Sequence, residues 1–314
     1  MRVTGNTFTD TLVTQLNSLA ARQYRLQSEA ATGQRIQAPE DDPSGMARAL
    51  DLLSESSTVG QYSQTITALQ DRTTSAYNAI SSLKTISDRA GEIATQGGDP
   101  TKPIQDLKSY AAEVTQMIKQ AVQTMNTKSA QDYIFGGTAT GQAPYQIQTD
   151  ADGNVTGVTY AGNSSVAQHQ IADGTTVSVD VPGQNNTGSG PRGVITDSRY
   201  GADFFNHLIS LQNHLLNGDT TSINNTDQPA LLNDENNIVA QVANNGVLQT
   251  RLDASASMAS ARLASLKTTL TSVAGADLSQ TLVKLSEAQN AYQVALQTSS
   301  NILNLQQSLL SSIG

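Results

Sequence analysis

The sequence predicts a mainly α-helical protein with an inserted β-domain, whose long helices form an antiparallel bundle. Along most of the chain, apolar residues recur at steps of four and three, which is the spacing of a helix that packs against other helices. This spacing is present at both ends of the chain and is lost between residues 138 and 197, where Gly, Thr, Asn and Asp dominate. Such a composition is typical of short strands joined by turns.

The helices expected at the two ends of the chain carry matching apolar seams. The N-terminal seam consists of Leu12, Leu16, Leu19, Gln23 and Leu26. The C-terminal seam consists of Leu278, Leu282, Leu285, Gln289, Tyr292, Leu296, Ser299, Leu303, Gln306, Leu310 and Ile313. The strict seven-residue period predicts a left-handed supercoil, because a straight helix would rotate its stripe away by about 20° per heptad. We therefore expect the two terminal helices to pack on each other and to form a coiled coil on assembly.

Turn and breaker residues mark where the next helices begin and end. Asp42 is a suitable N-cap and Pro43 a favoured first helical residue, so a long helix is expected from there to about residue 95. Gly97, Gly98 and Pro100 end this helix. The apolar face that follows predicts a second helix, which returns antiparallel to the first. Its residues are Leu107, Ala111, Val114, Ile118, Ala121 and Met125.

The region that starts at Asp132 predicts strands. Residues 133–137, Tyr-Ile-Phe-Gly-Gly, are typical of a strand that ends in a turn. Asp152-Gly153 and Asp173-Gly174 suit turns that need a positive φ angle, so we expect a compact antiparallel meander. Its short strands are expected at residues 144–148, 155–160, 166–171 and 175–181.

Helices return after residue 200. Phe204, Phe205, Leu208, Leu211 and Leu215 share one face of an amphipathic helix that ends near Gly218. A fourth long helix is expected up to about residue 273, and residues 274–276, Ala-Gly-Ala, separate it from the terminal helix. The apolar seam of this fourth helix is Ile238, Val242, Asn245, Gln249, Leu252, Ala256, Ala259, Leu263, Leu266, Leu270 and Val273.

We accordingly expect three regions in the chain. Residues 1–43 and 275–314 would form a terminal coiled-coil domain. Residues 44–137 and 198–274 would form a long-helix bundle, and residues 138–197 a small outer β-domain.

Composition argues against several classes of function. The 314-residue chain is 37% hydrophobic and 4% aromatic, which disfavours a single thick globular core. A net charge of −9 disfavours a nucleic-acid partner. The chain has no cysteine, so disulfides, thiolate metal sites and cysteine nucleophiles are excluded. We expect no membrane insertion, because no stretch reaches the roughly 20 apolar residues of a membrane span, and no cleaved secretory signal at the N-terminus.

We expect no catalytic, cofactor-binding or metal site. His207 and His214 share a helical face, but a metal ion would need further ligands, and we interpret both as solvated surface residues. Residues 150–154, Asp-Ala-Asp-Gly-Asn, faintly match a calcium loop and are interpreted as a hairpin turn. The sequence therefore predicts a non-enzymatic protein without cofactors.

The terminal helices are expected to fold mainly within an assembly. Ordering the backbone costs about 1–2 kcal/mol per residue, whereas burying a large apolar side chain returns about 1.5–3 kcal/mol. A second apolar stripe on the C-terminal helix needs further neighbours: Val283, Val294, Ile302, Leu305 and Leu309. An ordinary intramolecular bundle is the alternative. The predicted assembly seam comprises Leu12, Leu16, Leu19, Leu26, Leu278, Leu282, Leu285, Tyr292, Leu296, Leu303, Leu310 and Ile313.

Three segments resemble the flagellin superfamily of flagellar axial proteins. Residues 38–45, Ala-Pro-Glu-Asp-Asp-Pro-Ser-Gly, resemble the segment between the first two helices of flagellins. Residues 132–137, Asp-Tyr-Ile-Phe-Gly-Gly, resemble the hook-associated protein 3 family within that superfamily, and residues 246–253 resemble its C-terminal helix. The resemblance covers residues 1–137 and 200–314.

The resemblance implies a structural ring of subunits at the hook-filament junction of the bacterial flagellum, joining hook-associated protein 1 to flagellin. It also implies secretion through the flagellar type III export apparatus. A dedicated export chaperone would contact the C-terminal stripe at Leu296, Leu303 and Leu310. Two other interpretations are open at this point: a small flagellin that forms the filament itself, and a secreted coiled-coil adhesin whose β-domain binds a ligand.

Overall fold

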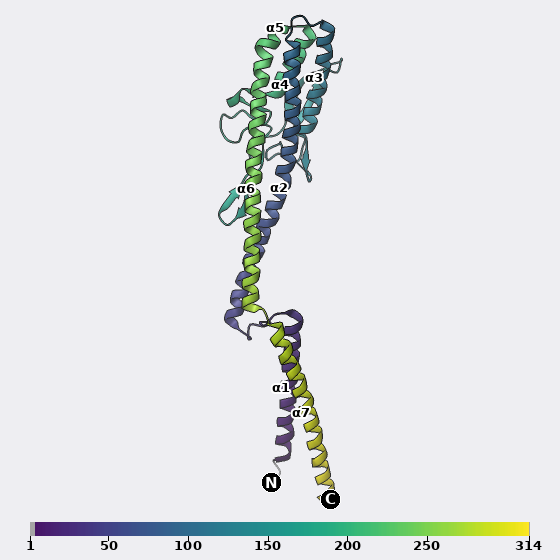
Figure 1. Ribbon diagram of the computed structural model, residues 1–314, viewed down its shortest axis with the longest axis vertical. Coiled ribbons are helices and arrows are strands. Elements are labelled where there is room, and N and C mark those ends of the chain that lie inside the picture. The colour runs from purple at the N-terminus through teal and green to yellow at the C-terminus, as the bar shows by residue number, and fades with distance from the viewer. Residues whose placement is uncertain (1–3, 314) are drawn as a thin grey trace. The chain divides into compact units, whose positions relative to one another are not determined.

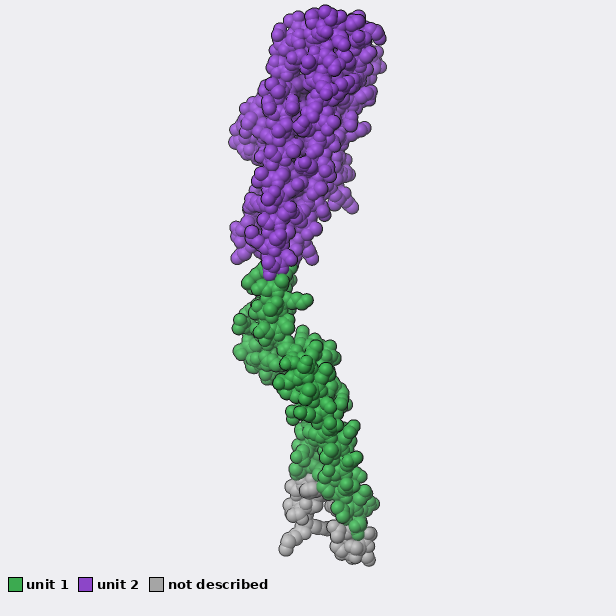
Figure 2. Space-filling view, viewed as in Figure 1, with its two compact units in different colours: residues 1–58, 262–314 green, residues 59–261 purple. Residues whose placement is uncertain are grey.

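The computed structural model describes the backbone of residues 4–313, and the side chains of residues 10–302, 304, 305, 307 and 308. The chain forms two compact units, which Figure 2 shows in different colours. Unit 1 comprises residues 1–58 and 262–314, and unit 2 comprises residues 59–261. Within the described residues, no helix has both the length and the apolar character of a membrane span.

The described residues of unit 1 are mainly helical. It contains α1 (Thr4–Thr32), the first turns of α2 (Pro43–Gly97), the last turns of α6 (Gln228–Ala274), and α7 (Leu278–Ile313). Helices α1 and α7 lie side by side and antiparallel, so the start of α1 lies beside the end of α7 (Figure 1). The four-three spacing therefore predicted the helices of this unit correctly.

Unit 2 is a bundle in which the rest of α2 and α6 is joined by α3 (Ile104–Met125) and α4 (Phe204–Asn217) (Figure 1). The short elements α5 (Thr220–Ser222) and η2 (Ile223–Asp227) connect α4 to α6, and Gly218 ends α4 with a φ of 70°. The faces predicted for α3 and α4 are the buried ones. Fully buried core side chains include Ile80, Leu83, Ile93, Leu107, Ile118, Met125, Phe204 and Leu208.

Strands lie between α3 and α4. The first four are β1 (Lys128–Ser129), β2 (Asp132–Tyr133), β3 (Tyr145–Thr149) and β4 (Val155–Tyr160). The next five are β5 (His169–Ala172), β6 (Thr175–Val177), β7 (Gln184–Asn185), β8 (Thr196–Asp197) and β9 (Ala202–Asp203). The 3-10 helix η1 (Ser198–Tyr200) separates β8 from β9. Gly153 and Gly174 have φ values of 84° and 63°, as their predicted turn positions require.

The expected antiparallel meander is wrong. Hairpins β3–β4 and β5–β6 form separate two-stranded sheets, and β7 pairs with β8 in parallel within a three-stranded sheet. The hairpins do not continue into each other because they pack on different partners. Tyr145 and Val155 of the first hairpin join the core of α3 and α4, whereas Ile171 and Val177 of the second pack with Ile66 of α2 and with α6.

Residues 138–197 thus lie within unit 2 and share its core. Arg72 of α2 also forms an ion pair with Asp180, at 2.9 Å from Nη2 to Oδ1, and the Asp180 side chain is almost fully buried. The boundaries of the two units fall at residues 58/59 and 261/262. The division into three regions, with boundaries at 43/44 and 274/275, stays a prediction.

We predict that Leu208→Ala lowers the free energy of unfolding of unit 2 by about 2–5 kcal/mol, because the side chain is fully buried in the shared core. Urea unfolding followed by circular dichroism measures the change. Val247→Ala is the matched control, since this side chain is 69% exposed and should change stability by less than about 0.5 kcal/mol. Equal effects of the two variants would contradict the assigned core.

Candidate assembly surfaces

On α7, small side chains occupy the most buried positions of its contact with α1. On α7 the buried positions are Thr281, Ala288 and Ser299, each at most 7% exposed. Thr281, Ala288 and the half-buried Ala295 are seven residues apart, so one heptad column faces α1. Small residues let the two backbones approach closely, but they remove little apolar surface from water.

The structure divides the predicted seam into two sets. Leu26 is buried against α7, and Leu12, Leu16, Leu19, Leu285 and Tyr292 are half-buried. Leu278, Leu282 and Leu296 instead remain 49%, 56% and 44% exposed. The side chains of Leu303, Leu310 and Ile313 lie outside the described residues.

The exposed surface of α7 therefore carries large apolar side chains among polar ones. Val283, Val294 and Leu305 of the second stripe are also exposed, and Ile302 is half-buried. The side chain of Leu309 lies outside the described residues. Two sets of large apolar side chains exposed along one helix favour an interaction surface.

A backbone bridge joins the two segments that lead into the terminal helices. The Arg35 amide donates to the Ala274 carbonyl at 2.8 Å, and the Ala276 amide donates to the Gly33 carbonyl at 2.9 Å. The guanidinium of Arg35 also donates to the Val273 carbonyl at 3.0 Å. These bonds fix where α7 starts relative to where α1 ends.

The two aspartates of residues 38–45 both accept hydrogen bonds from backbone amides. The Asp41 carboxylate accepts hydrogen bonds from the Gln37 and Ala38 amides and contacts Arg25, and these amides hold its pKa below the usual value. Asp42 accepts from the Gly45 amide at 2.9 Å, which caps α2 at Pro43 as predicted and lowers the pKa of Asp42. A Cβ on Gly45 would lie 2.5 Å from Asp42 Oδ2.

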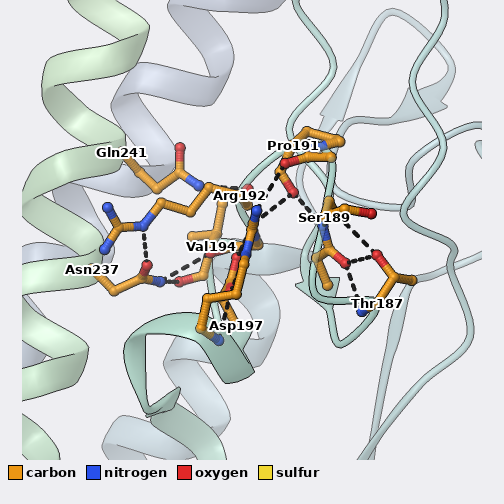
Figure 3. Close-up of polar contacts among 12 residues, drawn as sticks. Thr187, Ser189, Pro191, Arg192, Val194, Asp197, Asn237 and Gln241 are labelled. Atoms are coloured by element: carbon orange, nitrogen blue, oxygen red, sulfur yellow. Dashed lines mark hydrogen bonds and ion pairs between the residues drawn. The ribbon is translucent and has the colours of Figure 1, made fainter.

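On unit 2, a polar clamp holds the segment before η1 against α6 (Figure 3). Asn237 donates from Nδ2 to the Gly193 and Val194 carbonyls at 2.9 and 2.7 Å and accepts from Arg192 Nε at 2.5 Å. Gln241 Nε2 donates to the Arg192 carbonyl at 2.6 Å. The Arg192 guanidinium also stacks 3.6 Å from the ring centre of the exposed Tyr200.

The interpretation of His207 and His214 as solvated residues is wrong. His207 Nδ1 lies 2.7 Å from Asp234 Oδ2, and His214 Nδ1 lies 2.7 Å from Asp227 Oδ2, with both carboxylates buried. Burial lowers the pKa of His207, but the hydrogen bond and charge of Asp234 outweigh it, and the pKa is raised overall. The pairs bind α4 to η2 and α6. Within the described residues, no cluster of side chains suits a metal ion.

Sequence reasoning missed Asn237, Gln241 and the two His–Asp pairs. Asn237 and Gln241 are four residues apart, each directly before a seam residue, Ile238 or Val242. Polar residues that repeat beside an apolar seam were a usable signal for a buried polar contact. For the histidines, the acidic partners lie 13 and 27 residues away, and nothing in the local pattern pairs them.

Comparison with known proteins shows which families this chain is similar to. Residues 3–140 match the family described as the bacterial flagellin N-terminal helical region. No curated protein sequence matches the chain. The match shows that the N-terminal part of the chain is similar to the helical region of bacterial flagellins.

Several solved structures of flagellar hook-associated proteins share the fold of this chain. A structure from Vibrio parahaemolyticus described as a flagellar hook-associated protein is 18% identical, with a TM-score of 0.64 over 75% of this chain and 100% of that one. Hook-associated protein-3 of Legionella pneumophila is 13% identical, with a TM-score of 0.59 over 71% and 98%. FlgL of Bacillus cereus is 17% identical, with a TM-score of 0.55 over 70% and 99%. The chain has the fold of these proteins, which confirms the predicted resemblance to hook-associated protein 3.

We predict that Asp42→Ala frays the first turn of α2, because the Gly45 amide loses its acceptor. Amide hydrogen exchange at Gly45 should become several-fold faster. The unchanged protein should lose the same protection at acid pH. The lowered pKa of Asp42 means that its carboxylate stabilises the fold above the unfolded pKa of about 3.9, and this stabilisation is lost as pH falls through the folded pKa. Glu40→Ala on the same exposed segment is the control, and equal acceleration in both variants would contradict the capping role.

We predict that the His207–Asp234 pair stabilises unit 2 more at pH 6 than at pH 9. A raised histidine pKa contributes stability fully below the unfolded value of about 6.5, and this is lost as pH rises through the folded value. Urea midpoints across pH for the unchanged protein and His207→Gln measure the effect, which the variant should abolish. His169→Gln, in β5, is the control; an unchanged pH profile in His207→Gln would exclude the pair as its source.

Proposed function

We propose that this protein is a structural component of the bacterial flagellum, located at the hook-filament junction, where it links hook-associated protein 1 to flagellin. The observation that carries the proposal is that α7 has two different sets of side chains, one facing α1 and one exposed. Small residues at Thr281, Ala288 and Ser299 face α1, and large apolar side chains such as Leu282 and Leu296 remain exposed for other subunits. The flagellin N-terminal match and the fold of the FlgL structures support it.

The proposed partners follow from the same surface. The exposed set at Leu278, Leu282 and Leu296 would pack against sister copies in a ring, together with the rest of the predicted seam. Before assembly, an export chaperone would cover Leu296, Leu303 and Leu310, and the type III export apparatus would secrete the chain. We also propose that residues 1–43 and 275–314 line the inner tube of the assembly and become fully ordered only there.

A small flagellin that forms the filament itself is the second candidate, because the matched family is a flagellin region. Immunogold labelling of intact flagella separates the two proposals. A junction protein gives a single band beside the hook, whereas a flagellin gives label along the whole shaft. Absence of label from flagella would reject both, and would favour the secreted adhesin, which should bind its ligand without the terminal helices.

We predict that deletion of residues 296–314 abolishes assembly, because it removes the exposed Leu296 and Leu305 together with the C-terminal part of the predicted seam. Electron microscopy should show hooks without attached filaments. Secretion into the medium is measured in parallel, so that an export defect is distinguished from an assembly defect. Normal filaments on cells that carry the truncated protein would contradict the proposal.

A milder change tests the surface itself. We predict that Leu282→Gln combined with Leu296→Gln reduces attached filaments at least about tenfold, since each exposed side chain would lose about 1.5–3 kcal/mol of burial in the assembly. The monomer should keep its unfolding curve. Gln293→Ala, at an exposed polar position of α7, is the control and should assemble normally.

A further inference from the structure

Unit 2 carries a groove that the proposed function does not use. It lies between α2 and the start of α6 and has a volume of about 730 Å³. Ser87, Gly91 and Ala94 of α2 line one side, and Leu231 and Leu232 of α6 line the other. Lys84 and Asp88, which pair at 2.7 Å, stand at its edge with Glu235.

The α2 side of the groove is shaped for close approach of another backbone. Gly91 is the decisive position, since a Cβ built there would meet no atom within 4 Å. With Ser87 four residues before it and Thr95 four residues after it, small side chains follow one face of the helix. Rows of this kind let a neighbouring helix pack at short distance.

A second observation on the wall of the groove is the buried hydroxyl of Ser87. The residue is 2% exposed, and its Oγ has no hydrogen-bond partner. Ser82 and Thr95 of the same helix each donate to the carbonyl four residues earlier, at 2.9 Å. A buried hydroxyl without a partner costs free energy that a docked polar group would recover.

The outer face of α6 offers a matching surface further along the same unit. Every position of one stripe is exposed and uncharged: Val239, Ala243, Val247, Thr250, Ala254 and Met258. Val247 and Met258 are 69% and 70% exposed. The apolar side chains of the stripe suit the wall at Leu231 and Leu232. The hydroxyl of Thr250 could supply the hydrogen-bond partner that Ser87 Oγ lacks.

We propose that the groove between α2 and α6 receives the outer stripe of α6 from a second copy of this chain. This inference rests on the proposed function, because it names the surface of unit 2 through which sister subunits meet. The groove and the stripe are different surfaces, so the contact is heterologous and propagates from copy to copy instead of closing a dimer. Leu232 and Val247 are 15 residues apart, so parallel neighbours would be offset by about 22 Å along the helix.

Disulfide crosslinking tests the contact directly, because the chain has no cysteine of its own. Cells that make the double variant Leu232→Cys and Val247→Cys are oxidised, and flagella are sheared and run on a non-reducing gel. The two positions lie too far apart to bridge within one chain, so a ladder of crosslinked copies is expected. The pair Leu232→Cys and Asn213→Cys, with its second cysteine at an exposed position of α4, should give no ladder.

Filling the groove provides the second measurement. Gly91→Leu should leave the urea midpoint of the monomer unchanged or raised, because the new side chain meets open space, yet reduce incorporation into flagella at least tenfold. Gly60→Leu is the matched control, since its Cβ also meets nothing within 4 Å and it lies outside both surfaces.

The outcomes separate this inference from the proposed function. A ladder together with the loss in Gly91→Leu supports the contact. Protein that is incorporated into flagella but gives no ladder, or Gly91→Leu that assembles as well as Gly60→Leu, overturns the contact and leaves the junction role standing. Absence of the unmodified protein from flagella overturns both.

Discussion

Two helices that pack side by side can bury only one stripe of each, and this constraint organises both units of the protein. In unit 2 the remaining faces of α2 and α6 are covered by other elements of the same chain. Helices α3 and α4 complete one core, and hairpin β5–β6 closes a second core around Ile66 and Leu252. In the described part of unit 1, α1 and α7 pack mainly on each other, so large side chains such as Leu282 stay exposed. The same packing rule thus leaves the apolar helix faces of unit 2 largely covered and part of those in unit 1 exposed.

The sequence predicted the helices well because their signal is periodic and local. The breaks at Asp42-Pro43, Gly97 and Gly218 fall where the structure ends or starts helices. What the period cannot tell is which of two adjacent columns faces the partner. On α7 the column of Thr281 and Ala288 faces α1. The adjacent column, which begins one residue later at Leu282, stays exposed. A leucine-rich stripe indicates that another helix must pack on it. It does not indicate whether that helix belongs to the same chain or to another copy.

The strands were harder to predict for a different physical reason. Turn residues such as Gly153 and Gly174 specify hairpins, since the positive φ angle is a local requirement. The partner of a hairpin face is set by distant residues, and here the two hairpins pack on different helices. The buried polar contacts behave in the same way. Asn237 satisfies carbonyls 43 and 44 residues away, and His207 finds its carboxylate 27 residues away.

The scarcity of charge follows from the same constraint. A helix that is to be covered on several sides cannot place Lys or Glu on those sides, because a charge buried without a partner is costly. Ser and Thr avoid this cost, since their hydroxyls can bond the carbonyl of the preceding turn. Thr73 and Ser299 both do so, at 2.6 and 2.7 Å, while buried in helix seams. Such residues need nothing from their neighbour, so they can face a helix of the same chain or of another copy. With only 14% charged residues, the chain keeps most helix faces available for contact. The Ser87 hydroxyl on α2 has no such bond, and it lies on the wall of the groove between α2 and α6.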